Sequence, residues 1–69
     1  MNKQISVAEI VERLGGPGRT ARTLGILSYT TPLRWKREGR IPPKRWKEVQ
    51  QALAEAGLEV EIDAIVKAR

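Results

Sequence analysis

The sequence predicts one all-α domain of four to five short helices. Two observations indicate this fold class: apolar residues recur at helical spacing in short stretches, and Gly or Pro separates each stretch from the next. A chain of 69 residues has room for one small core, and no repeat, linker or low-complexity tract divides it. We therefore interpret residues 1–69 as a single domain.

The first helix is predicted over residues 6–14. Ser6 and Glu9 have the S-x-x-E spacing of a capping box, in which each side chain accepts a hydrogen bond from the backbone amide of the other residue. Gly15 and Gly16 then end the helix. Between these signals, one apolar face is formed at the spacing i, i+3, i+4 and i+7 by Val7, Ile10, Val11 and Leu14.

The second helix is predicted over residues 17–24. Proline is favoured in the first turn of a helix, where Pro17 stands, and Gly25 follows the last residue as a stop. Ala21 and Leu24 are three residues apart and are expected to face inward. Two basic residues then remain on the outside, Arg19 and Arg22.

The third helix is predicted to end before Gly39, but its start is open. If Ser28 is the cap, the helix spans about residues 29–38 and holds Pro32 in its first turn, where the ring crowds only a carbonyl at the helix edge. If Thr31 is the cap, Pro32 is the first helical residue and the helix is shorter.

A fourth helix is predicted over about residues 44–56, after an extended connector that contains Pro42 and Pro43. Its inward side chains are expected at helical spacing: Trp46, Val49, Leu53 and Ala56. Residues 58–62 alternate between apolar and acidic, which favours a strand, whereas Asp63 can cap a last helical turn. The sequence therefore leaves two alternatives for the tail, a short strand or a fifth helix.

The basic residues are concentrated in one segment. Ten of the 13 lie in residues 13–47, together with one acid, Glu38, so this segment carries a net charge of +9. Residues 1–12 carry −1 and residues 48–69 carry −3. A block of this charge attracts arrays of phosphates, because each neutralised phosphate releases condensed counterions. The distribution therefore favours nucleic acid as the partner over a face that serves only solubility.

Composition excludes several other classes. The chain has no Cys and no His, which removes disulfides, thiol chemistry, Cys/His zinc sites and His-based catalysis. We expect no enzyme, cofactor, metal or small-molecule ligand, and interpret the acids of the tail as solvated. No apolar run reaches the roughly 18 residues of a membrane span, and the first residues lack the pattern of a secretion signal. We expect a cytoplasmic, nucleoid-associated protein with no membrane partner.

The middle of the chain resembles the phage Cro and lambda-repressor-like regulators, especially the small Cro/YdaS-like type. The residues that carry the resemblance are Ala21, Leu24, Gly25 and the run W-x-x-x-G-R-I-P-P that begins at Trp35. It covers about residues 7–56 and implies a helix-turn-helix over about residues 17–38. In that family the alanine lets the two helices cross closely, the glycine forms the turn and the tryptophan fills the core. The turn here is one residue longer, and Pro32 replaces a branched aliphatic residue.

The resemblance implies that the third helix enters a major groove and meets base edges with its exposed early positions, which are Tyr29, Thr30, Leu33 and Arg34. Arg34 is the first choice for reading a base, since a guanidinium bridges two acceptors of guanine. The alternatives for Arg34 are a phosphate or an i,i+4 pair with Glu38. Contacts to the DNA backbone are predicted for Arg19, Thr20, Arg22, Ser28, Lys36, Arg37, Arg40, Lys44 and Arg45.

The function that follows is a sequence-specific transcriptional regulator of phage or prophage type. We expect a repressor that binds double-stranded DNA at a pseudo-palindromic operator as a homodimer. A dimerisation tail is predicted in residues 58–69, because five aliphatic residues exceed what a chain end needs: Leu58, Val60, Ile62, Ile65 and Val66.

Three alternatives remain from the sequence. An excisionase- or MerR-like winged helix-turn-helix protein has a similar L-G…W-x-x-x-G-R-x-P run, but continues into a β-wing where residues 44–56 indicate a helix. A small antitoxin or adaptor would act by protein contact through the acidic tail. An RNA-binding module would display aromatic residues for stacking, whereas Trp35 and Trp46 are predicted to be core residues.

Overall fold

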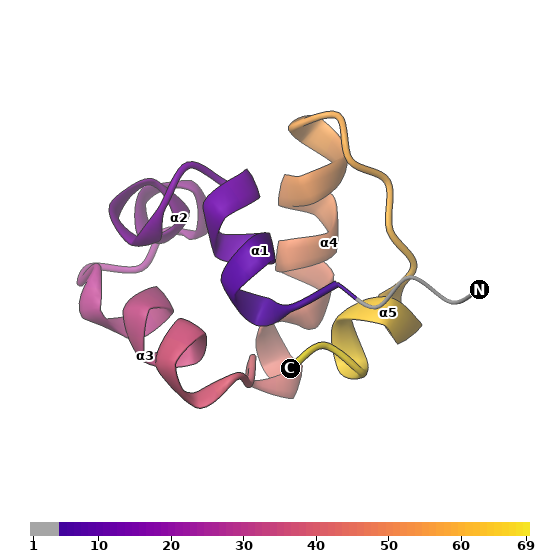
Figure 1. Cartoon of the computed structure of the whole chain (residues 1–69). Helices are drawn as coiled ribbons and strands as arrows, with labels where there is room; N and C mark the ends of the chain where they lie inside the picture. The colour runs from indigo at the N-terminus through magenta and orange to yellow at the C-terminus, as the bar shows by residue number, and fades with distance from the viewer. Residues whose placement is uncertain (1–4) are drawn as a thin grey trace.

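The computed structural model describes residues 5–69, and these residues form an all-helical domain (Figure 1). No strand occurs within this range. One 3-10 turn precedes the fourth helix, and the elements in chain order are α1 (Val7–Arg13), α2 (Pro17–Leu24), α3 (Thr30–Glu38), η1 (Pro43–Arg45), α4 (Trp46–Glu55) and α5 (Ile62–Val66). The all-α prediction is confirmed.

The helices are arranged with α2 and α3 at one end of the molecule and α5 at the other (Figure 1). Helix α3 packs against both α1 and α2, while α4 contacts α2 and carries α5 on its far side. The domain measures 36 × 24 × 20 Å. This arrangement places the turn between α2 and α3 at an outer edge of the protein, away from α5.

Helix α1 begins and packs as its sequence predicts. The hydroxyl oxygen of Ser6 accepts a hydrogen bond from the amide of Glu9 at 3.0 Å, and all four predicted apolar side chains are buried. The second half of the capping box is wrong, because the Glu9 carboxylate lies 3.6 Å from the Arg13 guanidinium one turn further along the helix.

The start of α3 is decided by Ser28. Its hydroxyl oxygen accepts a hydrogen bond from the amide of Thr30 at 3.3 Å, and Thr30 is the first helical residue. Pro32 lies inside the first turn and is buried, and the alternative with Thr31 as the cap is wrong. Burial of the proline ring against the core compensates for the amide that proline lacks.

Helix α4 differs from its prediction in two ways. It begins at Trp46, after the 3-10 turn, and the indole Nε1–H of Trp46 donates to the carbonyl oxygen of Ile41 at 2.9 Å. Its buried face is Val49, Ala52 and Leu53, whereas Ala56 is exposed at the C-cap. The chain turns away at Gly57, which has a φ of 90°, so Ala56 lies beyond the core.

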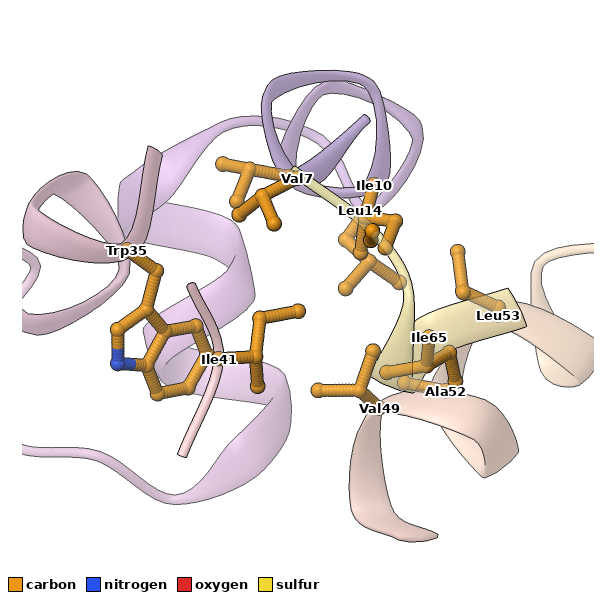
Figure 2. Packing of buried hydrophobic residues seen from close by; sticks show 11 residues of the cluster. Val7, Ile10, Leu14, Trp35, Ile41, Val49, Ala52, Leu53 and Ile65 are labelled. Carbon is orange, nitrogen blue, oxygen red and sulfur yellow. The ribbon is translucent and has the colours of Figure 1, made fainter. Parts of the chain in front are cut away.

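The core extends through the middle of the domain (Figure 2). It runs from Trp35 on α3, past Ile41 and Val49, to Leu53 on α4 and Ile65 on α5. Trp35 is buried as predicted, and Trp46 packs against the same cluster while partly exposed. Ile41 was not predicted as a core residue, because it stands next to proline in a connector whose path depends on the tertiary contacts of both sides.

The tail ends in a helix, and the strand alternative is wrong. Residues 58–61 form neither a strand nor a helix, and α5 follows them. The backbone is held by Gln50 Nε2, which donates to the Val60 carbonyl at 3.0 Å, and by the Val7 amide, which donates to the Arg69 carbonyl at 2.8 Å. The tail therefore covers the core of its own chain.

This packing changes the role of the five aliphatic residues assigned to a dimer. Ile65 is 2% exposed inside the core, so it is not available to a second copy. Leu58, Val60 and Ile62 are partly buried against the same core, and only Val66 is exposed, at 44%.

No helix among residues 5–69 is long and apolar enough to cross a lipid bilayer.

Candidate nucleic-acid interface

Ion pairs divide the basic residues of segment 13–47 into two groups. Four ion pairs occur among residues 5–69: Arg13–Glu9 at 3.6 Å, Lys36–Glu12 at 2.8 Å, Arg45–Glu48 at 3.0 Å and Lys67–Asp63 at 3.2 Å. Three of the ten basic residues of the segment thus have an intramolecular carboxylate. The other seven are exposed and have no ion-pair partner in the described range: Arg19, Arg22, Arg34, Arg37, Arg40, Lys44 and Lys47.

Two predicted phosphate contacts belong to the paired group. Lys36 Nζ donates to Glu12 Oε1, and Arg45 Nη1 donates to both carboxylate oxygens of Glu48, at 3.0 and 3.4 Å. A phosphate would have to displace a carboxylate from each of these side chains. Lys36 and Arg45 are therefore paired within the chain, and their contacts to the DNA backbone stay a prediction. The sequence did not indicate the first pair, because its members are 24 residues apart.

One face of α3 carries three exposed polar side chains. Thr30, Arg34 and Arg37 follow the spacing i, i+4 and i+7, which places them on one side of a helix, and all three are exposed. Pro32 and Trp35 are buried on the opposite side. The structure thus places two predicted base contacts, Thr30 and Arg34, on one free face, and adds Arg37, which had been assigned to the backbone.

The other two predicted base contacts flank this face. Tyr29 is 59% exposed and is the N-cap residue of α3, while Leu33 is only partly exposed. The hydroxyls of Ser28 and Thr30 lie 2.6 Å apart and share one hydrogen bond. The Ser28 oxygen also accepts from the amide of Thr30, whereas the Thr30 oxygen keeps at least one lone pair free whichever hydroxyl donates, so an outside group still has an acceptor there.

Arg34 has no carboxylate partner within the described chain. Glu38 stands at i+4, but the two residues form no ion pair, although both are exposed. The pairing alternative for Arg34 is therefore wrong, and the guanidinium is free for an acceptor outside the protein. The choice between a base edge and a phosphate stays a prediction.

Thr20 is the one predicted contact that the structure removes. It is 0% exposed, and its hydroxyl donates to the Val11 carbonyl at 3.4 Å, so the prediction of a DNA-backbone contact is wrong. The sequence suggested exposure because Thr20 stands beside Arg19 near the helix start. Helix α2 contacts α1, α3 and α4, and this buries a wider face than two inward residues indicate.

The remaining free basic residues lie on different sides. Arg37 and Arg40 line one groove together with Glu38 and with Lys67 and Arg69 of the tail. Two basic residues of the tail thus lie beside the basic segment, although Lys67 is paired with Asp63. Sequence analysis missed these two because the fold alone brings them there. Lys47 instead lines a groove with Glu59 and Glu61, on the side of α4 that faces the tail. Arg19 and Arg22 are exposed on α2, and Lys44 on η1.

Leu27 is a further residue that sequence analysis did not single out. It lies in the turn between α2 and α3 and is 105% exposed, more than any other large apolar side chain in the described range. Its neighbour Ile26 packs against the core instead. Two adjacent apolar residues in a turn predict that one faces inward, but they do not indicate which.

No protein-family model matches the chain, and neither a curated protein nor a solved structure shows significant similarity to it. The candidate interface therefore rests on the residues of this chain and on their geometry.

Proposed function

We propose that this protein is a sequence-specific DNA-binding regulator of transcription, in which α2 and α3 act as a helix-turn-helix of the lambda-repressor type. The observation that carries the proposal is the free face of α3, where Arg34 stands between Thr30 and Arg37 without a carboxylate partner. A helix with unpaired donors on one face and its other face buried suits a major groove, which admits one α-helix.

The geometry of the two helices supports this use. Gly25 has a left-handed φ of 72° and its conformation ends α2, while the Ile26 amide donates to the Ala21 carbonyl at 2.7 Å. The small side chain of Ala21 is buried where α2 packs against α3. Two helices joined by five residues and packed in this way hold α3 outward at the edge of the domain (Figure 1).

The free cations supply the sequence-independent part of the binding. Arg22 on α2, Arg40 after α3 and Lys44 on η1 are exposed and unpaired, so each can reach a phosphate at no cost in intramolecular ion pairs. Such contacts fix the register of the protein on the duplex, whereas Arg34 and Thr30 supply base recognition. A domain of this size that holds an operator represses transcription by occupying it, and repression is accordingly the proposed outcome.

The winged helix-turn-helix alternative loses its support. A β-wing after the third helix is missing from residues 5–69, where η1 and α4 follow instead. The RNA alternative is weakened, because Trp35 is buried and the indole N–H of Trp46 is bonded to Ile41, so stacking would rest on Tyr29 alone. The adaptor alternative becomes one outcome of the test below.

Selection of bound fragments from random duplex DNA, followed by anisotropy titrations over a range of salt, tests the proposal. We expect one enriched motif and a log–log salt slope of several units, about −0.9 for each phosphate contact. A Lys47→Ala variant is the matched control for Arg34→Ala, since both remove one exposed, unpaired positive charge and Lys47 lies on the side of α4 that faces the tail. Selection without any enriched motif, or no duplex binding at low salt, would overturn the proposal and favour the adaptor.

A further inference from the structure

We infer that Leu27 is a specificity-determining residue, which contacts a thymine methyl group at the edge of the base pairs that α3 faces. This inference rests on the proposed function and adds a contact that neither the basic charge nor the helix face indicates. Leu27 is fully exposed and belongs to the turn between α2 and α3, and this turn lies at the outer edge of the domain (Figure 1).

The turn holds Leu27 outward from both sides. Before it, the Ile26 amide is bonded to Ala21 at 2.7 Å, and the Ile26 side chain packs against the core. After it, the Ser28 hydroxyl oxygen accepts a hydrogen bond from the amide of Thr30, the first residue of α3. The backbone on both sides of Leu27 is therefore fixed by hydrogen bonds, and its side chain is exposed in this arrangement.

The position of Leu27 distinguishes it from an ordinary exposed leucine. Single apolar residues on a surface are common and need no explanation. Here, however, two of the three exposed large apolar side chains within residues 5–69, Leu27 and Tyr29, stand on either side of Ser28, just before α3. In helix-turn-helix docking this end of the recognition helix lies nearest the base edges.

The surroundings of Leu27 favour DNA over a protein partner. No acidic residue occurs in residues 13–37, and the nearest basic residues on α2 and α3, Arg22 and Arg34, are exposed and unpaired. A protein-docking surface needs a contiguous apolar patch of several hundred Å², more than two side chains provide. The thymine C5-methyl is the apolar group that the major groove presents among its polar edges. An exposed leucine in a segment whose only free charges are cations therefore matches thymine.

The test replaces each thymine of the selected site in turn by deoxyuridine, which keeps base pairing and lacks the methyl group. For wild-type protein we expect about fourfold weaker binding at one outer position, the factor for burying one CH₂-sized group. Leu27→Ala should lose a similar factor on the thymine site and show no further loss with deoxyuridine there. Leu27→Met keeps a large apolar side chain, so its binding should still weaken when deoxyuridine replaces that thymine, almost as much as for the wild-type protein.

Val66→Ala is the matched control, because Val66 is also an exposed aliphatic residue but lies on α5. It should leave the deoxyuridine profile unchanged, whatever it does to self-association. Sites without a thymine near the turn, a flat wild-type profile, or an unchanged profile in Leu27→Ala would each overturn the inference while leaving the proposed function intact. Failure to bind any duplex would overturn both. Loss of self-association in Leu27→Ala, with DNA affinity unchanged, would instead assign the residue to a protein contact.

Discussion

Lys36 Nζ on α3 lies 2.8 Å from Glu12 Oε1 on α1, and this ion pair joins two helices that are separated by α2 in the chain. Both side chains are partly exposed, so the pair contributes at most about 1 kcal/mol to the free energy of unfolding. Its larger consequence is electrostatic. It neutralises one cation in the middle of α3, so that Arg34 and Arg37 carry the unpaired positive charge of this helix.

Neighbouring residues Lys36 and Arg37 provide a direct test of this difference. Arg37→Ala should reduce the salt slope of duplex binding by about 0.9, because an unpaired guanidinium is lost. Lys36→Ala removes the same formal charge but should change the slope less, since its charge is already balanced by Glu12. The measurement is a set of titrations at several salt concentrations. Equal slopes for the two variants would show that the ion pair opens on DNA.

Arg34 and Lys44 separate base recognition from phosphate contact. Arg34→Ala should lose about 1–3 kcal/mol on the selected site and relax the preference at one base pair, whereas Lys44→Ala should weaken binding to all sequences about equally. Competition titrations with selected and random duplexes measure both effects. If Arg34→Ala weakens the two duplexes by the same factor, its guanidinium binds a phosphate, and base recognition shifts toward Thr30.

Thr20 and Thr30 form a matched pair of threonines, one buried and one exposed. Thr20→Val should leave DNA affinity unchanged and change the free energy of unfolding by less than about 1 kcal/mol. The reason is that the Val11 carbonyl also accepts from the amide of Gly16, at 2.9 Å, so it stays bonded. Thr30→Val should weaken binding to the selected site. Urea unfolding and anisotropy distinguish the two, and DNA loss in Thr20→Val would contradict the structure.

Ile65 tests whether the tail belongs to the core. Ile65→Ala should lower the free energy of unfolding by about 2–5 kcal/mol, as is usual for a buried aliphatic residue. This is comparable to the whole stability expected of a domain this small, about 3–5 kcal/mol. Truncation after Gly57 should accordingly unfold the protein and not yield a folded monomer. Val66→Ala, at an exposed site on the same helix, is the control. Equal urea midpoints for the two variants would show that α5 is dispensable.

The homodimer on a pseudo-palindromic operator stays a prediction, and Val66 is the tail residue left to test it. If two copies associate through the tail, Val66→Asp should shift the sedimentation profile to monomer without changing the melting temperature. A wild-type chain that sediments as a monomer at every concentration, both free and on its selected DNA, would contradict the dimer.

Local signals in the sequence determined most helix boundaries. The range of α2 was predicted to the residue, because Pro17 at its start and the left-handed Gly25 after it act within a few residues. The Ser6 cap of α1 and the burial of Trp35 likewise follow from spacing alone. The segregation of positive charge in residues 13–47 is also a property of the sequence.

Contacts between distant residues decided the rest. Of the two alternatives for the tail, helix α5 formed and a strand did not, because a strand needs a partner strand and the apolar side chains of the tail pack against the core beside α4 instead. Thr20 was buried by three neighbouring helices, and Lys36 was neutralised by a carboxylate 24 residues away. In the turn between α2 and α3, Ile26 packs against the core and its neighbour Leu27 is exposed. Charge and periodicity are local in the chain, whereas which side chains remain free for a partner depends on packing in three dimensions.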